Sequence, residues 1–124
     1  MSAAVAALKS VEDYLALPEL PIVHVPDAAS EGFCYRVLEV GMYRATEEEC
    51  DRAGLAADWD PAMRCFGLPT VTILCAKDIK RFRLPLSMAE WAGRMVVQAQ
   101  INRTLFPAKI EFGLRWDCYF AELR

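Results

Sequence analysis

Residues able to do acid–base or nucleophilic chemistry are few in this chain of 124 amino acids. His24 is its single histidine and the only conventional base near neutral pH. A cysteine–histidine mechanism would have to use it, with Asp27 close enough in sequence to orient the ring. A lone histidine between prolines on an apolar strand is, however, more typical of a packed residue. A small Cys/His enzyme is therefore our third hypothesis, and we assign no catalytic residue.

The cysteines do not predict a metal site or a disulfide framework. They are five, an odd number, and widely spaced, whereas zinc sites usually draw their ligands from close pairs. Asp58 and Asp60 flank Trp59, but two carboxylates supply too few oxygens for a hard cation. We predict no metal and no cofactor, and we expect most of the thiols to be buried as small apolar groups. The cysteines are Cys34, Cys50, Cys65, Cys75 and Cys118.

A basic segment is the clearest signal for a ligand. Four positive charges surround one aromatic residue, which could stack on a base while the charges attract phosphates. Binding of single-stranded nucleic acid is therefore our second hypothesis. Two observations favour a structural interpretation: the chain has a net charge of −3, and charges on a hairpin protect a sheet edge from aggregation. The segment comprises Lys77, Lys80, Arg81, Phe82 and Arg83.

Exposed apolar residues favour our leading hypothesis, a protein without catalytic activity that binds another protein or its own copies. Trp59 stands between two aspartates in an expected loop, and interfaces favour tryptophan at such points. Val97 and Ile101 lie off the apolar face of a predicted helix. We assign these three residues to a protein interface. An assembly or inhibitor factor from a virus or mobile element would fit this description.

Charge is divided unequally along the chain. Residues 1–62 contain four basic and twelve acidic residues, a net charge of −8, whereas residues 63–124 contain ten basic and five acidic residues, a net charge of +5. Such a division can mark an interaction surface. The alternative, which we favour, is that both halves fold together and neutralise each other.

Size and composition predict one domain over residues 1–124. Hydrophobic residues make up 55% and charged residues 25% of the chain, which is enough to fill a core and excludes general disorder. The N-terminus lacks the charged and apolar pattern of a signal peptide. No apolar run approaches the roughly 20 residues that span a bilayer. We expect a cytoplasmic protein without a membrane partner, able to form homo-oligomers.

Periodicity and capping residues predict the elements. Thr46 and the glutamates that follow it are typical of a helix start, and Gly54 of its end. Asp60-Pro61 indicates a second, short helix, and Ser87 with Glu90 a capping box. Trp91 and Trp116 lie on apolar faces and are assigned to the core. The expected helices are 3–17, 46–54, 61–66 and 87–104; the expected strands are 22–25, 33–43, 70–76, 79–84 and 110–121, with a loop longer than two residues at Lys77-Asp78 and a bulge at Gly113.

This order predicts an α+β fold. From residue 33 to residue 124 it is β-α-β-β-α-β, the split βαβ or ferredoxin-like order. Residues 1–26 add a helix and a short strand in front of that core.

Overall fold

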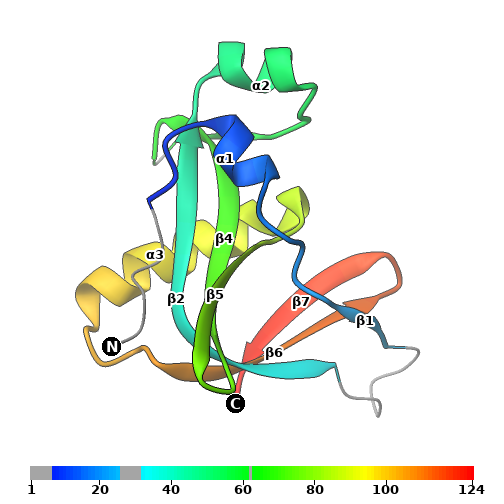
Figure 1. The fold of residues 1–124 in the computed structure, drawn as a ribbon, viewed down its shortest axis with the longest axis vertical. Coiled ribbons are helices and arrows are strands. Elements are labelled where there is room, and N and C mark those ends of the chain that lie inside the picture. Colours follow the sequence, from blue (N-terminus) through cyan, green and yellow to red (C-terminus); the bar gives the residue numbers. More distant parts are fainter. Residues whose placement is uncertain (1–6, 26–31, 62) are drawn as a thin grey trace.

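The computed structural model describes residues 7–25, 32–61 and 63–124, which form a mixed sheet covered by helices on both sides (Figure 1). Its longest strand, β2 (Phe33–Ala45), is rich in the aromatic and β-branched residues that favour strands. Three helices and a 3-10 turn accompany the sheet: α1 (Val11–Leu15), α2 (Glu47–Ala53), η1 (Leu86–Met88) and α3 (Ala89–Ile101). The other strands are β1 (Val23–His24), β3 (Trp59–Asp60), β4 (Cys65–Cys75), β5 (Asp78–Arg83), β6 (Ala108–Arg115) and β7 (Cys118–Leu123).

The strand β2 holds the sheet together because it pairs with two strands in succession. Its first residues run antiparallel to β6, and after an irregularity between Val37 and Glu39 it runs antiparallel to β4. The hairpin partners β5 and β7 then extend the sheet beyond β4 and β6. The strand β1 is parallel to β6, so the sheet is mixed. The fold is a single α+β domain.

The predicted ferredoxin-like strand order is not confirmed. In a split βαβ unit the chain crosses the sheet and returns parallel to its first strand. Here α2 lies beyond the end of the sheet against α1 (Figure 1), and the chain returns as β4, antiparallel to β2. Among the described residues, β5 pairs with β4 and, through a bridge at Arg83, with Glu19.

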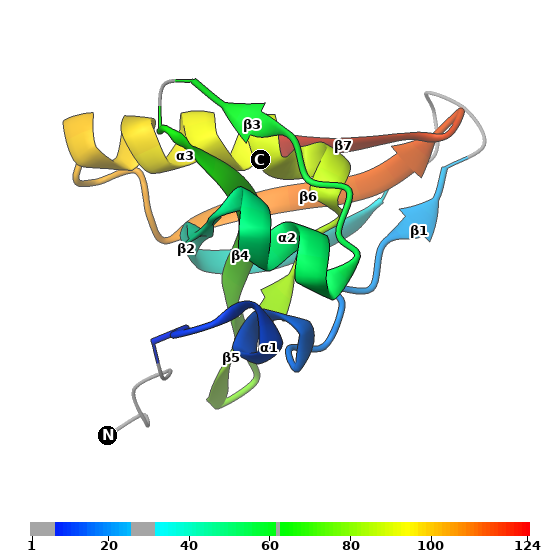
Figure 2. The ribbon, with the colours of Figure 1, turned by 90° about the horizontal axis from the view of Figure 1, so that it is seen from above.

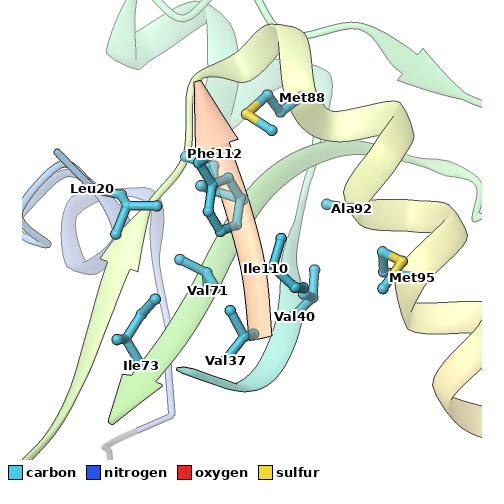
Figure 3. Packing of buried hydrophobic residues seen from close by; sticks show 11 residues of the cluster. Leu20, Val37, Val40, Val71, Ile73, Met88, Ala92, Met95, Ile110 and Phe112 are labelled. Carbon is cyan, nitrogen blue, oxygen red and sulfur yellow. The ribbon is translucent and has the colours of Figure 1, made fainter. Parts of the chain in front are cut away.

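Two hydrophobic clusters fill the space between the layers. In Figure 2, α3 lies on one side of the sheet and α1 on the other. The larger cluster joins Ala92 and Met95 of α3 to the sheet residues Val40, Val71 and Phe112 (Figure 3). The smaller cluster joins α1 and α2 to the opposite face of β2 and β4, and comprises Val11, Tyr14, Ala45, Cys50 and Leu68. None of the helices in the described ranges is long and apolar enough to cross a membrane.

Predictions based on local capping chemistry differ in outcome. The helix after Thr46 is confirmed: a capping box forms between Thr46 and Glu49, and Gly54 ends the helix at φ 67°. Residues 3–6 of the predicted first helix lie outside the described residues. Within the described part of the chain this helix begins at Val11, because the Ser10 side chain accepts a hydrogen bond from the Asp13 amide and so forms the N-cap. The capping box predicted at Ser87 is absent, since neither η1 nor α3 has a side-chain cap in the described structure.

The helix predicted over 61–66 is wrong. The Asp60 carboxylate accepts a hydrogen bond from the Met63 amide at 3.2 Å, as an N-cap would. The chain then enters the left-handed region at Arg64, where φ is 54°, and β4 begins at Cys65. The helical turn therefore cannot propagate. Residue 62 lies outside the described residues.

Two turns also differ from prediction. The loop between β4 and β5 contains only Ala76 and Lys77, with Ala76 at φ 53°, so it is not longer than two residues. The strand predicted over 110–121 is instead the hairpin β6–β7, which turns at Trp116 and Asp117. Gly113 forms no bulge, since it lies in regular register opposite Phe120.

Candidate functional site

The turn between β6 and β7 places a large aromatic side chain in an unfavourable backbone conformation. Arg115 pairs with Cys118 across the turn, and the two residues between them have φ values of 49° at Trp116 and 61° at Asp117. Positive φ at both central positions defines a type I′ turn, which strongly prefers Asn-Gly. For a bulky residue such as tryptophan this conformation costs about 1–2 kcal/mol. The sequence thus uses a poor turn former at this position.

Burial of the Trp116 side chain does not offset the cost of this backbone conformation. The side chain is 77% exposed, the highest exposed fraction among the large apolar side chains that the structure describes. The turn lies at the margin of the molecule, beyond β1 (Figure 1). The prediction that Trp116 belongs to the core is therefore wrong, whereas Trp91 packs edge-to-face on Phe112 at 5.6 Å between ring centres, as a core residue does.

Side chains on one face of the hairpin brace the strands that present Trp116. The Phe120 ring lies directly over Gly113, where a Cβ atom would approach the ring to 2.4 Å. The Arg115 guanidinium covers the same ring, 4.8 Å from its centre. A side chain at position 113 would therefore displace the Phe120 ring, and the last residue pairs before the turn are held by aromatic and cation–π contacts.

A buried carboxylate anchors the base of the hairpin. Glu111 is 3% exposed; it accepts a hydrogen bond from the Gly32 amide at 2.7 Å and forms an ion pair with Arg124. Arg124 also pairs with Glu122 at 3.0 Å. The Gly32 hydrogen bond, followed by the Arg124 hydrogen bond, lowers the pKa of Glu111 below its ordinary value. These contacts tie the start of β2 and the end of β7 to β6.

A groove lined by both apolar and polar surface opens beside the hairpin. Its volume is about 460 Å³, and Tyr119, three residues after Trp116, lines it. The opposite walls come from α1 and from the segments around residues 19–22 and 83–86, and include Leu15, which is 37% exposed. Because Tyr119 also lines a second hollow of about 400 Å³ beside Trp91 and Arg94, it separates two depressions on this side of the molecule.

The walls of the groove are fixed by buried contacts. The Tyr14 hydroxyl lies 3.1 Å from the Pro69 carbonyl and 3.2 Å from the Leu84 carbonyl, both of them acceptors for its proton. Burial raises the pKa of Tyr14 far above its usual range. Arg83 donates to the Leu17 carbonyl at 2.9 Å and pairs with Glu19 at 3.5 Å. That ion pair joins the acidic half of the sequence to the basic half at the mouth of the groove.

The interface residues predicted from the sequence are all exposed: Trp59 by 53%, Val97 by 45% and Ile101 by 76%. Trp59 lies in β3 and packs edge-to-face on Phe66, with 5.3 Å between ring centres. Val97 and Ile101 follow Gly93 at four-residue intervals on α3, and Gly93 lies against Asp60. The three residues are therefore accessible, but none of them lines the groove beside the hairpin.

The basic segment forms β5 and its turn, with its charges divided over two faces. Lys77 and Lys80 are exposed, whereas Phe82 is partly buried against the larger hydrophobic cluster. Arg83 makes the structural contacts described above, and Arg81 pairs with Thr72 of β4 on the same face as Arg83. Phe82 thus does not share a face with the arginines, which gives a stacking role less support.

The described residues do not gather the remaining chemical groups into one centre. His24 is exposed on β1 rather than packed, and Asp27 lies outside the described residues. Burial raises the pKa of Cys50 and of Cys65, which disfavours a reactive thiolate. Cys34 and Cys118 are exposed, so fewer thiols are buried than predicted. No group of three or more potential metal ligands occurs among residues 7–25, 32–61 and 63–124.

Comparisons with protein-family models, with curated proteins and with solved structures give no match. The site must therefore be interpreted from its own geometry. Sequence reasoning missed Trp116 and Tyr119 because the alternating pattern over 110–121 continues through the turn. One signal was available: a twelve-residue strand exceeds the usual length of three to ten residues, which favours a turn within it.

Proposed function

We propose that this protein acts by binding another polypeptide chain through the tip of the β6–β7 hairpin. The observation that supports this most strongly is the exposed Trp116 side chain on a strained turn. Backbone strain persists where surrounding structure enforces it, and it concentrates at binding and active sites. Tryptophan is also the residue type most enriched among the side chains that dominate binding energy at interfaces.

The surroundings of Trp116 support a binding role over a purely structural one. Phe120, Arg115 and Gly113 stiffen the strands, so little conformational entropy is lost when the tip binds. The adjacent groove offers apolar wall on one side and the ion pair between Arg83 and Glu19 at its mouth. A rigid aromatic anchor beside a groove that combines apolar and polar surface is the usual composition of a protein interface.

Photo-crosslinking tests this proposal. A benzophenone amino acid replaces Trp116 in one variant and Arg103, an exposed residue after α3, in a control variant. We expect a discrete adduct with a polypeptide from the variant at position 116 only, either with the chain itself or with another protein. A third variant with the probe at Ile101 tests the surface predicted from sequence. Adducts at position 101 without any at position 116 would overturn the assignment of the hairpin.

A further inference from the structure

We propose that the partner is a second copy of this chain, and that two copies insert their Trp116 side chains reciprocally into each other's grooves beside Tyr119. This inference rests on the proposed function and names the occupant of the groove. It follows from the position of anchor and groove on one molecule, from their size and from their charges.

The anchor and the groove are close neighbours on the same part of the molecule. Trp116 lies at the turn, and Tyr119 of the same hairpin forms one wall of the groove. In a dimer with twofold symmetry the same surface is used on both copies, so that residue i contacts residue j and j contacts i. Such a contact requires a protruding side chain beside a hollow. When the Trp116 side chain of one copy enters the groove of the other, the twofold axis brings the second Trp116 side chain to the first copy's groove.

The sizes agree. A volume of about 460 Å³ is sufficient for an indole ring. The lining offers apolar side chains, among them Leu15, Leu20 and Ile22, to the ring face, and polar atoms to the indole N–H. A buried tryptophan removes about 150–250 Å² from solvent. Two tryptophans, together with the groove walls that they cover, would bury roughly 600–1,000 Å² in total. Stable interfaces bury about 1,200–2,000 Å², which is above that range, so we expect a weak dimer that dissociates on dilution.

The charges are complementary as well. The anchor is flanked by Arg115 and Asp117, and no ion pair of either residue occurs within the described ranges. The Nε atom of Arg115 is buried without a hydrogen-bond partner. At the mouth of the groove, Glu19 has a side chain that is 76% exposed and Arg83 one that is 29% exposed. Because Glu19 and Arg83 pair with each other at 3.5 Å, insertion of the tip would extend this ion pair into a network of four charges, in which Asp117 faces Arg83 and Arg115 faces Glu19.

Light scattering on a sizing column, over a range of protein concentrations, tests whether two copies insert their Trp116 side chains reciprocally. For the unmodified chain we expect a mass of twice 13.9 kDa at high concentration, and the monomer mass on dilution. Trp116→Ala, which removes the anchor, and Leu15→Arg, which obstructs the groove at an exposed position, should each be monomeric. Trp59→Ala, which changes an exposed tryptophan elsewhere, is the matched control and should remain dimeric.

A mixture of the two monomeric variants gives the sharpest result. Trp116→Ala retains an open groove, and Leu15→Arg retains its anchor, so the mixture should form a heterodimer through one of the two contacts, at higher protein concentrations than the unmodified dimer requires. Circular dichroism of each variant checks that it is folded. The proposed dimer would be excluded if the unmodified chain were monomeric at every concentration, or if Trp116→Ala left the dimer unaffected. If the crosslink at position 116 then joins another protein, binding by the hairpin survives; if no adduct forms, both proposals fail.

Discussion

The guanidinium carbon of Arg115 lies 4.8 Å from the centre of the Phe120 ring, and the same ring covers Gly113. This contact connects the residue before the turn to the strand after it. The presentation of Trp116 therefore depends on the packing of the hairpin as well as on the turn itself.

Replacement of Phe120 should loosen the hairpin. Phe120→Ala removes the cation–π contact and leaves Gly113 uncovered, and we expect a loss of about 1–2 kcal/mol in the free energy of unfolding, less than for a fully buried phenylalanine. Urea unfolding measures this loss, and hydrogen exchange at Arg115 and Cys118 should become faster. Leu123→Ala, on the same strand but 55% exposed, is the control, and equal effects of the two changes would contradict the bracing role.

The buried carboxylate of Glu111 should make stability depend on acidity. Its pKa lies below the ordinary value of 4.5 because the Gly32 amide and Arg124 stabilise the ionised form. A lowered pKa contributes stability that is complete above pH 4.5 and is lost as the pH falls through the folded value. Glu111→Gln should lose about 2 kcal/mol at pH 7.

Thermal unfolding between pH 7 and pH 2 measures this dependence. The variant should show a smaller decrease on the acid side than the unmodified chain. Glu122→Gln, which removes only an exposed partner of Arg124, is the control. An acid-side decrease of the same size in the Glu111→Gln variant would exclude Glu111 as its source.

Tyr14 should stabilise the wall of the groove. Tyr14→Phe removes the hydroxyl that contacts the carbonyls of Pro69 and Leu84, which should cost about 1–2 kcal/mol. Because burial raises the pKa of Tyr14 above 10, its contribution is complete below pH 10 and is lost as the pH rises toward the folded value. Chemical unfolding at pH 7 and pH 11 checks both effects. If Tyr14→Phe has the stability of the unmodified chain at pH 7, the hydrogen bonds contribute nothing.

The nucleic-acid hypothesis makes an opposing prediction at β5. If Lys77 and Lys80 bound a phosphate backbone, affinity for single-stranded DNA would fall steeply with salt and would be lost in Lys77→Glu with Lys80→Glu. If the protein binds through the β6–β7 hairpin, we expect weak binding of DNA that is the same in the unmodified chain and in the variant with both lysines replaced. We also expect this variant to associate as the unmodified chain does. Fluorescence anisotropy with a labelled oligonucleotide, over a series of salt concentrations, distinguishes the two. A steep salt dependence that the double change abolishes would favour the nucleic-acid hypothesis.

Local chemistry explains where the sequence was predictive. Thr46, Glu49 and Gly54 form a capped helix because their contacts lie within a few residues of one another. The strand over residues 33–43 was recognised because its aromatic and β-branched residues have few other favourable conformations. The off-face positions Val97 and Ile101 were identified correctly as exposed from helical spacing alone.

The errors arise where tertiary contacts or unusual backbone override local preference. The strand predicted over 70–76 begins already at Cys65, because tertiary contacts accommodate Gly67 and Pro69 within β4. A Cβ at Gly67 would come within 2.4 Å of the Met42 side chain, and the Pro69 carbonyl accepts a hydrogen bond from the Leu84 amide. Trp116 is not typical of a type I′ turn, and at the second central position glycine is preferred to an aspartate such as Asp117. The candidate site depends on that turn, and so it could not be found by applying ordinary turn preferences.

The most direct test replaces the two central residues of the turn with residues that favour its backbone conformation. Trp116→Asn combined with Asp117→Gly supplies the preferred type I′ residues and removes the anchor. We predict a gain of about 1–2 kcal/mol in the free energy of unfolding, together with loss of every association that depends on the hairpin, measured by light scattering. Because the variant is more stable, that loss cannot result from unfolding. A variant that associates as the unmodified chain does would contradict the claim that Trp116 is held in a strained turn for binding.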